Sequence, residues 1–260
     1  MRLELLVHNM LLLFHVAAAT GFGVTAFLTR EQDANGQLQD QLNRRGIPTE
    51  ELPCVATQRL EGYDHLCNTL SNGGDDWDSR ALLPKLHPWI IVASPEGAVL
   101  FAEAWAHSRD PTASKPKIAA IGVGTAEILA AAMLPADFTP SVATCKALAA
   151  ELPLEADVGA GSVLYPACDL VADTVADGLA ARGLRMRRIN TYTTVPAEWS
   201  AEDLKRAQRA RVVTFDSPLA ARVWSERAGT AAAAICIGEA SAAEARSCGF
   251  ERVRLFPRDQ

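Results

Sequence analysis

The feature of this sequence that most constrains its fold is an internal repeat in which a buried strand runs directly into a Ser-Pro helix start. An apolar run beginning at Trp89 leads into Ser94, and residues 211–216 lead in the same way into Ser217, 123 residues later. Serine is a good helix N-cap and proline suits the first helical position, so each copy predicts a strand followed at once by a helix. Continuous apolar strands that alternate with helices are typical of a parallel sheet covered on both faces.

Two further segments are repeated, and their order along the chain predicts two similar domains. A strand followed by a glycine turn occurs at Gly122 and again at Gly238, and residues 28–46 resemble residues 165–183. The N-terminal piece has its twin in the middle of the chain. The Ser-Pro and glycine-turn segments of one unit, at Ser94 and Gly122, lie before residues 165–183. Those of the second unit, at Ser217 and Gly238, lie after them. The simplest assembly is an α/β fold with two similar parallel-sheet domains, one of them discontinuous.

The domain limits follow from the positions of these pieces. Domain A is expected to be discontinuous, with residues 24–54 and 195–260, and domain B to span residues 60–191. The chain then crosses between the domains twice, and a double crossing predicts a hinge with a ligand cleft between them. Residues 1–23 contain an apolar run too short to span a bilayer. They are expected to form an N-terminal extension, either a targeting segment or a disordered start.

Apolar periodicity predicts the remaining elements. Strands are expected over residues 24–29, 47–55, 89–94, 117–122, 161–166, 186–195, 211–217 and 234–238. Helices are expected over residues 34–46, from Pro95 to Trp105, from Gly122 through Ile128, Leu129 and Met133, within residues 141–152, along Val171, Val175 and Leu179 up to Gly183, and after Ser217 and Gly238.

Composition excludes several functional classes. The formal net charge is −6 and aromatic residues make up 6% of the chain, so neither a basic field nor a stacking surface for nucleic acid is expected. The six cysteines form no C-x-x-C pair and the histidines form no H-E-x-x-H, so we expect no metal site and no disulfide framework. The acidic stretch at residues 75–78 is interpreted as a solvated loop, with a cation site as the alternative.

The repeated motifs place hydroxyl and glycine residues at the expected ligand edge of each sheet. The two Ser-Pro serines either only cap their helices or belong to helix N-termini that bind an anion. Each repeated glycine is followed three residues later by a hydroxyl, in a turn whose N–H and O–H groups suit a carboxylate or phosphate. The candidate substrate-binding residues are Ser94, Gly122, Thr125, Ser217, Gly238 and Ser241.

Two other features bear on ligands. The G-x-G at Gly122 lacks the third glycine of a dinucleotide fingerprint, because Glu127 occupies that position, so neither a nicotinamide nor a flavin cofactor is expected. Lys146 stands on the predicted short helix and either is solvated or meets a substrate carboxylate. It completes the candidate binding set, and we expect the protein to use no cofactor.

Several motifs, taken in order along the chain, resemble uroporphyrinogen-III synthase. They are the two Ser-Pro helix starts together with L-T-R-E at 28–31, I-G-V-G-T-A at 121–126 and N-T-Y-T-T-V-P at 190–196. Each motif alone is short, and their order and spacing carry the resemblance, which runs from about Thr25 to Gly249.

Further motifs resemble one branch of the family, and two positions differ from the family pattern. F-T-P-S at 138–141 and L-A-A-E-L-P at 148–153 look like the plant and algal plastid branch of the family. Asp216 stands before the second Ser-Pro, where the family commonly has a hydroxyl residue, and Glu239 occupies a turn where proline is frequent.

What the resemblance implies is a cofactor-independent lyase of haem and chlorophyll biosynthesis. Such an enzyme takes hydroxymethylbilane, a linear tetrapyrrole with eight carboxylates, removes its terminal hydroxyl as water, inverts the last pyrrole ring and closes uroporphyrinogen III. The resemblance also implies that Tyr192, at the predicted domain crossing, is the catalytic residue. Its phenol either reaches into the cleft or only packs at the cleft edge.

Other functions remain as alternatives. The main one is a non-catalytic two-domain protein that binds a small molecule in the same cleft, and the second is a nucleotide-dependent oxidoreductase. We expect a monomer with no nucleic-acid and no membrane partner, and transient contact with neighbouring enzymes of the pathway is left open. The expected localisation is the plastid (chloroplast) in a plant or alga and the cytoplasm otherwise.

Overall fold

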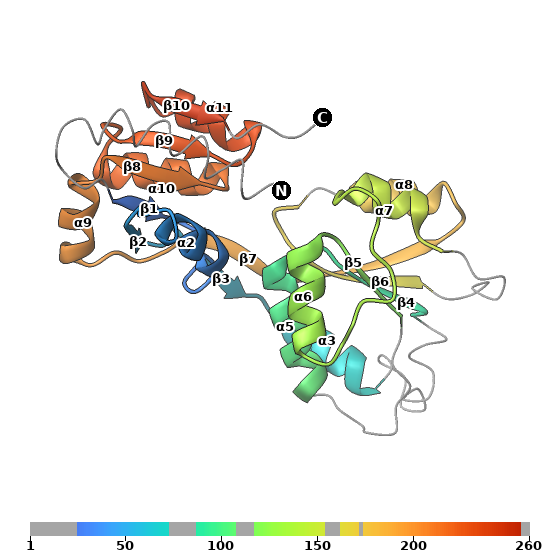
Figure 1. Ribbon diagram of the computed structural model, residues 1–260. Coiled ribbons are helices and arrows are strands. Elements are labelled where there is room, and N and C mark those ends of the chain that lie inside the picture. The colour runs from blue at the N-terminus through green and yellow to red at the C-terminus, as the bar shows by residue number, and fades with distance from the viewer. Residues whose placement is uncertain (1–24, 73–86, 108–116, 154–161, 172–173, 256–260) are drawn as a thin grey trace. The chain divides into compact units, whose positions relative to one another are not determined.

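The structure of the protein is a computed structural model that describes residues 25–72, 87–107, 117–153, 162–171 and 174–255. The expected N-terminal extension and the acidic stretch at 75–78 lie outside these ranges. The chain forms two compact units, unit 1 with residues 1–56 and 195–260, and unit 2 with residues 57–194. Each unit is built around one five-stranded sheet with helices packed on it (Figure 1), so the predicted fold class of two parallel-sheet α/β domains is confirmed.

Unit 1 consists of short buried strands that alternate with helices. Its elements are β1 (Ala26–Leu28), α2 (Gly36–Asn43), β2 (Thr49–Glu51), α9 (Ala201–Gln208), β8 (Val212–Phe215), α10 (Pro218–Ala228), β9 (Ala233–Cys236), α11 (Glu239–Ser247) and β10 (Val253–Leu255). The strand order is β10-β9-β8-β1-β2, and all neighbouring strands are parallel. After β1 the chain adds β2 on one side, whereas β8 and then β9 and β10 are added on the other side. The topological switch point therefore lies between β1 and β8.

The core of unit 1 on one face of its sheet centres on Trp224 of α10. This side chain is fully buried and makes edge contacts with Phe27 of β1, Phe215 of β8 and Trp199. Small residues of α10 and α11 pack into the same cluster. The parallel strands of unit 1 are therefore fixed by an aromatic centre beneath their hydrogen-bond ladder.

Unit 2 repeats the same design. Its elements are β3 (Val55–Arg59), α3 (Gly62–Asn72), β4 (Trp89–Val92), α5 (Pro95–His107), β5 (Lys117–Ala120), α6 (Val123–Ala131), α7 (Cys145–Glu151), β6 (Ser162–Cys168), α8 (Thr174–Ala180) and β7 (Arg185–Pro196). The strand order is β3-β7-β6-β4-β5, and β7, β6, β4 and β5 run parallel. The chain passes between the two units within β3 and again within β7.

Helices cover both faces of the unit 2 sheet, because successive strand residues point to opposite sides. Along β4, Ile90 and Val92 pack with α3, α5 and α6, whereas Trp89 and Ile91 pack with α7 and α8. Figure 1 shows these two groups of helices on opposite sides of the strands. A strand that is buried on both faces must be apolar throughout, which explains the uninterrupted run from Trp89.

Several elements differ from the predictions. Helices α3 and α9 were not predicted. The helix predicted through Met133 ends at Ala131, and Met133 follows in a left-handed turn with φ 62°. Val171 was placed on the helical stripe, but α8 begins at Thr174 and Val171 is exposed. In both cases the apolar residue continues the helical spacing beyond the end of the helix, so spacing alone overestimated the helix length.

Candidate functional site

The candidate site of unit 2 lies at the carboxyl end of β4, which is the topological switch point of its sheet. β4 stands between β5 and β6, and the chain adds β5 on one side and β6 and β7 on the other. Ligands of open α/β sheets bind outside the carboxyl ends of strands at such a point. Ser94 lies two residues beyond β4 and directly precedes Pro95, the first residue of α5.

Tyr192 meets Ser94 at this switch point. Its phenolic oxygen lies 2.7 Å from Ser94 Oγ, and the backbone N–H of Gly97 donates to the same Oγ over 2.9 Å. Tyr192 pairs in the sheet with Cys168 of β6, and β6 lies between β7 and β4, so the tyrosine reaches past one strand to contact the serine. The N-terminus of α5, a hydroxyl and a phenol thus form one connected chain of polar groups.

The surroundings of this pair keep the phenol protonated. Tyr192 is 5% exposed and belongs to the core cluster on the α3, α5 and α6 face. Burial raises the pKa of the Tyr192 phenol well above its ordinary value, and the hydrogen bond with Ser94 offsets only part of this rise. A phenol that keeps its proton across the physiological range can act as a hydrogen-bond or proton donor.

Gly97 permits this arrangement by having no side chain. A Cβ at this position would lie 3.2 Å from Ser94 Oγ and 3.5 Å from the Tyr192 phenolic oxygen. Both distances are shorter than or close to ordinary van der Waals contact. Gly97 was not singled out from the sequence, although its position three residues after a Ser-Pro serine places it where the capped N–H must lie.

The switch point of unit 1 carries an ion pair instead. Nε of Arg30, two residues beyond β1, lies 3.0 Å from Oδ2 of Asp216, which follows β8, and both side chains are partly exposed. The neighbouring Thr29 hydroxyl donates to the carbonyl of Thr214 over 2.5 Å and ties the two strands together. Arg30 is a cation at the ligand edge, and a guanidinium there suits a substrate carboxylate. Arg30 stands in one of the motifs quoted above but was given no role.

The other predicted binding residues lie at the carboxyl edges or in the first turns of the helices that follow. Gly122 and Gly238 are the N-caps of α6 and α11, and Gly122 has φ 90°. Ser217 caps α10 by accepting the N–H of Ala220 over 3.2 Å. Ser94 and Ser217 therefore do cap their helices, and anion binding at these positions stays a prediction.

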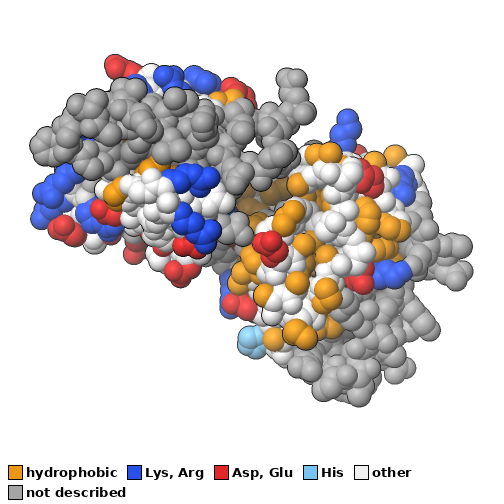
Figure 2. All heavy atoms as spheres, viewed as in Figure 1, with side chains coloured by type: hydrophobic (Ala, Val, Ile, Leu, Met, Phe, Trp, Pro, Cys, Tyr) orange, Lys and Arg blue, Asp and Glu red, His pale blue; other side chains and the backbone are white. Residues whose placement is uncertain are grey.

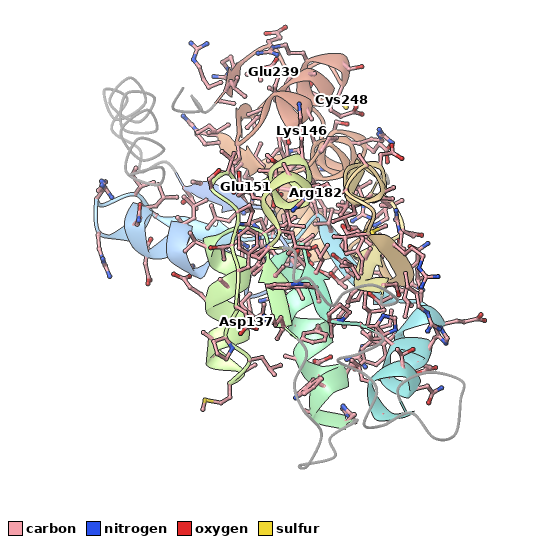
Figure 3. The ribbon with its side chains drawn as sticks, turned by 90° about the vertical axis from the view of Figure 1, so that its right-hand side faces the viewer. Asp137, Lys146, Glu151, Arg182, Glu239 and Cys248 are labelled. Carbon is pink, nitrogen blue, oxygen red and sulfur yellow. The ribbon has the colours of Figure 1, made fainter. Side chains whose placement is uncertain are left out.

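The remaining three predicted residues differ in accessibility. Thr125 in α6 and Ser241 in α11 are each only 2% exposed. Lys146 is exposed on α7. The C-terminal end of α7 is held by Arg182, two residues beyond α8, which donates hydrogen bonds to the carbonyls of Ala149 and Leu152 (Figure 3). The structure brings together Ser94 and Tyr192 but shows no contact of Lys146 with them.

Among the residues that the structure describes, no three His, Cys, Asp or Glu side chains gather as a metal site would require. No helix in these ranges is long and apolar enough to cross a membrane. All six cysteines are free thiols, and Cys54, Cys168 and Cys236 are buried. Burial raises the pKa of Cys236 to about 11, so this thiol keeps its proton at neutral pH.

The comparison with protein families decides the identity. A family model described as uroporphyrinogen-III synthase HemD matches residues 36–257, a range that contains both Ser94 and Tyr192. The chain belongs to the uroporphyrinogen-III synthase family. A relative from Oryza sativa subsp. japonica, named "Uroporphyrinogen-III synthase, chloroplastic", is 34% identical over 243 residues, covering 87% of this chain and 73% of the relative. The family membership places the protein in tetrapyrrole biosynthesis.

Solved structures agree on the fold. A uroporphyrinogen-III synthetase from Helicobacter pylori matches with a TM-score of 0.55 at 14% identity, covering 90% of this chain and 92% of the other. A mutant uroporphyrinogen III synthase from the extremely thermophilic bacterium Thermus thermophilus matches with a TM-score of 0.52 at 17% identity, covering 91% and 94%. At this level of identity the likeness supports the two-domain fold of the family and nothing finer.

Proposed function

We propose that the protein cyclises hydroxymethylbilane to uroporphyrinogen III, with loss of water and inversion of the terminal pyrrole ring. The observation that carries this proposal is the family match over residues 36–257. The Ser94–Tyr192 pair at the switch point of unit 2 adds a chemical reason, because it offers a protonated donor at the edge where ligands of such sheets bind.

The reaction class proposed is a cofactor-independent lyase. The carbon–oxygen bond of the terminal hydroxymethyl group breaks and its oxygen leaves as water. That carbon then bonds to the substituted carbon of the last ring, giving a spiro-pyrrolenine. The bond from the spiro carbon to the ring's original methylene bridge then breaks, and this methylene bonds to the free α-carbon across the ring nitrogen, which loses its proton. The ring is thereby inverted and the macrocycle closed. The sum is loss of water without oxidation or reduction, so the bond changes require no redox cofactor.

Tyr192 is proposed to assist the departure of the hydroxyl. When Ser94 donates its hydrogen to the Tyr192 oxygen, the phenol hydrogen becomes available for the leaving group. The N–H of Gly97 donates to Ser94 at the start of α5, where the helix dipole favours electron density on the oxygen. Connected hydrogen bonds polarise one another, so the chain from Gly97 through Ser94 strengthens Tyr192 as a donor. Ser94 is a positioning residue in this scheme.

Orientation of a flexible substrate is proposed to supply much of the remaining rate. The chain has a net charge of −6 while the substrate carries eight carboxylates, so local donors have to hold these groups. Helix N-termini after Ser94, Ser217, Gly122 and Gly238, together with Arg30, are proposed to do so.

The localisation and the oligomeric state of the enzyme are proposed as well. The rice relative is chloroplastic by its name, and we propose a plastid localisation if the source is a plant or alga and a cytoplasmic one otherwise. The protein is proposed to act as a monomer.

The test is direct conversion. Purified protein is incubated with enzymatically made hydroxymethylbilane, the products are oxidised, and the porphyrin isomers are separated by chromatography. Formation of type III product supports the enzyme. Type I product only, at the rate of a sample without protein, would instead favour the alternative of a binding protein without activity.

A further inference from the structure

Large hydrophobic side chains are exposed at particular places on the protein. Over the described residues they are Val99, Val123, Met133, Val142, Leu170, Val171, Ile237 and Leu255. Single exposed hydrophobic residues are common on protein surfaces, so position and grouping matter more than number. Figure 2 shows hydrophobic side chains gathered on the visible face of unit 2.

Three of these residues lie on either side of Ser94. Leu170 and Val171 follow the end of β6, and Val123 follows the end of β5. Val92 at the end of β4 pairs with Ala120 at the end of β5, so Ser94 and Gly122 each lie two residues beyond this pair, and β6 flanks β4 on the other side. Neighbouring strands lie about 4.8 Å apart. We call Val123, Leu170 and Val171 the apolar rim.

The backbone holds the rim residues outward. Gly122 has φ 90° and ψ 153°, a conformation that favours glycine, and this turn leaves Val123 75% exposed as the first residue of α6. On the other side, the N–H of Asp169 donates to the carbonyl of Tyr192 over 3.0 Å, and the N–H of Val171 donates to the carbonyl of Cys168. Leu170, between them, is 65% exposed. The turn that presents Leu170 is thus bonded to the backbone of Tyr192 itself.

We propose that the apolar rim is the surface on which pyrrole rings of the substrate lie, beside the Ser94–Tyr192 pair. This inference rests on the proposed function. A linear tetrapyrrole has apolar ring faces and carboxylate arms, and the rim offers apolar contact on both sides of a polar pair. Burial of this surface by a ligand removes apolar area from water, which favours binding. The rim therefore orients the rings while the helix N-termini receive the carboxylates.

The test uses exposed residues, whose replacement leaves the core untouched. Leu170→Ser and Val123→Thr remove apolar surface from the rim, and Val→Thr keeps the shape of the side chain. The control is Met133→Ser, because Met133 is 85% exposed and follows α6 at the end opposite to Val123. For each rim variant we expect KM for hydroxymethylbilane to rise about fivefold, with kcat changed less than about twofold, because uniform binding is lost. Met133→Ser should keep both constants.

Unchanged KM in both rim variants would overturn the inference, and so would an equal rise of KM in Met133→Ser.

A second copy of the chain is the competing occupant of the apolar rim. A wild-type dimer that Leu170→Ser converts to a monomer in sedimentation would also overturn the inference. If the wild type fails to convert hydroxymethylbilane, the proposed function is wrong. The apolar rim is then tested separately, by measuring the binding of uroporphyrin III to each variant through the change in fluorescence. Weaker binding by the rim variants only would support the inference, and equal binding by all variants would contradict it.

Discussion

The phenolic oxygen of Tyr192 and Oγ of Ser94 lie 2.7 Å apart although 98 residues separate them in the chain. Ser94 lies two residues beyond β4, at the switch point of the unit 2 sheet, and Tyr192 comes from the strand next but one. The contact joins a helix N-terminus, through Gly97, to a buried phenol. The account of activity proposed above depends on this pair more than on any other contact.

Replacement of Tyr192 by phenylalanine tests the phenol. The ring stays and only the O–H is removed, so packing in the core should survive. We expect turnover of Tyr192→Phe to fall about tenfold or more, because a general acid contributes about 10²–10⁴-fold. Type III should remain the main product, since the substrate is still oriented. A Phe variant that turns over like the wild type would show that Tyr192 is a packing residue.

Gly97→Ala should disturb the pair without removing either hydroxyl. The added Cβ would lie 3.2 Å from Ser94 Oγ, which must shift by a few tenths of an ångström, and would come into van der Waals contact with the Tyr192 oxygen at 3.5 Å. We expect turnover to fall about threefold to tenfold, because small displacements of a positioned donor are costly to rate. The thermal midpoint should change little, since alanine favours the helix over glycine.

Gly36→Ala is the matched control for this change. Gly36 begins a helix in unit 1, and its added Cβ would meet nothing within 4 Å. Its turnover should equal that of the wild type. Equal losses in the two glycine variants would mean that the effect at Gly97 has nothing to do with Ser94 and Tyr192.

Thr125→Ala tests the repeated hydroxyls as a distributed binding set. Thr125 is buried in the first turn of α6, and a neutral hydrogen bond contributes about 0.5–1.5 kcal/mol net. Turnover should therefore fall only in part, which steady-state kinetics would measure. Complete inactivation of a variant with an unchanged circular dichroism spectrum would point instead to a dedicated catalytic hydroxyl.

His87 should make the stability of the protein fall in mild acid. It is buried, and its Nδ1 lies 2.9 Å from the carbonyl oxygen of Ser162. Burial lowers the pKa of His87 below 6.5, the nearby Arg187 lowers it further, and the hydrogen bond to Ser162 opposes both effects. Below about pH 6.5 the unfolded chain takes up a proton that the folded state resists. The free energy of unfolding should thus decrease as the pH falls through this value.

Urea unfolding at pH 7.5 and 5.5 checks this prediction. His87→Gln should show a smaller loss between the two pH values than the wild type. The control is His107→Gln, because His107 lies on the exposed end of α5 and should leave the wild-type loss intact. The same loss in His87→Gln as in the wild type would contradict the assignment to His87.

The sequence predicted the fold class because the strands are buried on both faces and therefore apolar throughout. It did not reveal α9, which buries only Ala207 and so has no apolar stripe. The signal that could have found α9 is the capping box between Ser200 and Asp203. Helix α3 was missed as well, although Tyr63, Leu66, Cys67 and Leu70 follow the i, i+3, i+4, i+7 spacing of a helix with one buried face.

Less of the candidate site could be predicted. Ser94 and Tyr192 were both singled out, one from a repeat and one from a family resemblance, but nothing in either motif indicates that they touch. Their contact depends on strand order and on a tyrosine that reaches past β6, which are properties of the whole sheet. The Arg30–Asp216 pair was missed for the same reason, because its partners meet only through the β1–β8 pairing.

The measurement that tests the central claim most directly is the isomer distribution formed from hydroxymethylbilane in the presence and absence of the purified protein. Hydroxymethylbilane closes without inversion when no enzyme acts on it, so type I is the background. The account predicts mainly type III product, formed faster than the background closure and in proportion to protein concentration. Type I product at the background rate, from protein whose circular dichroism shows it to be folded, would contradict the account.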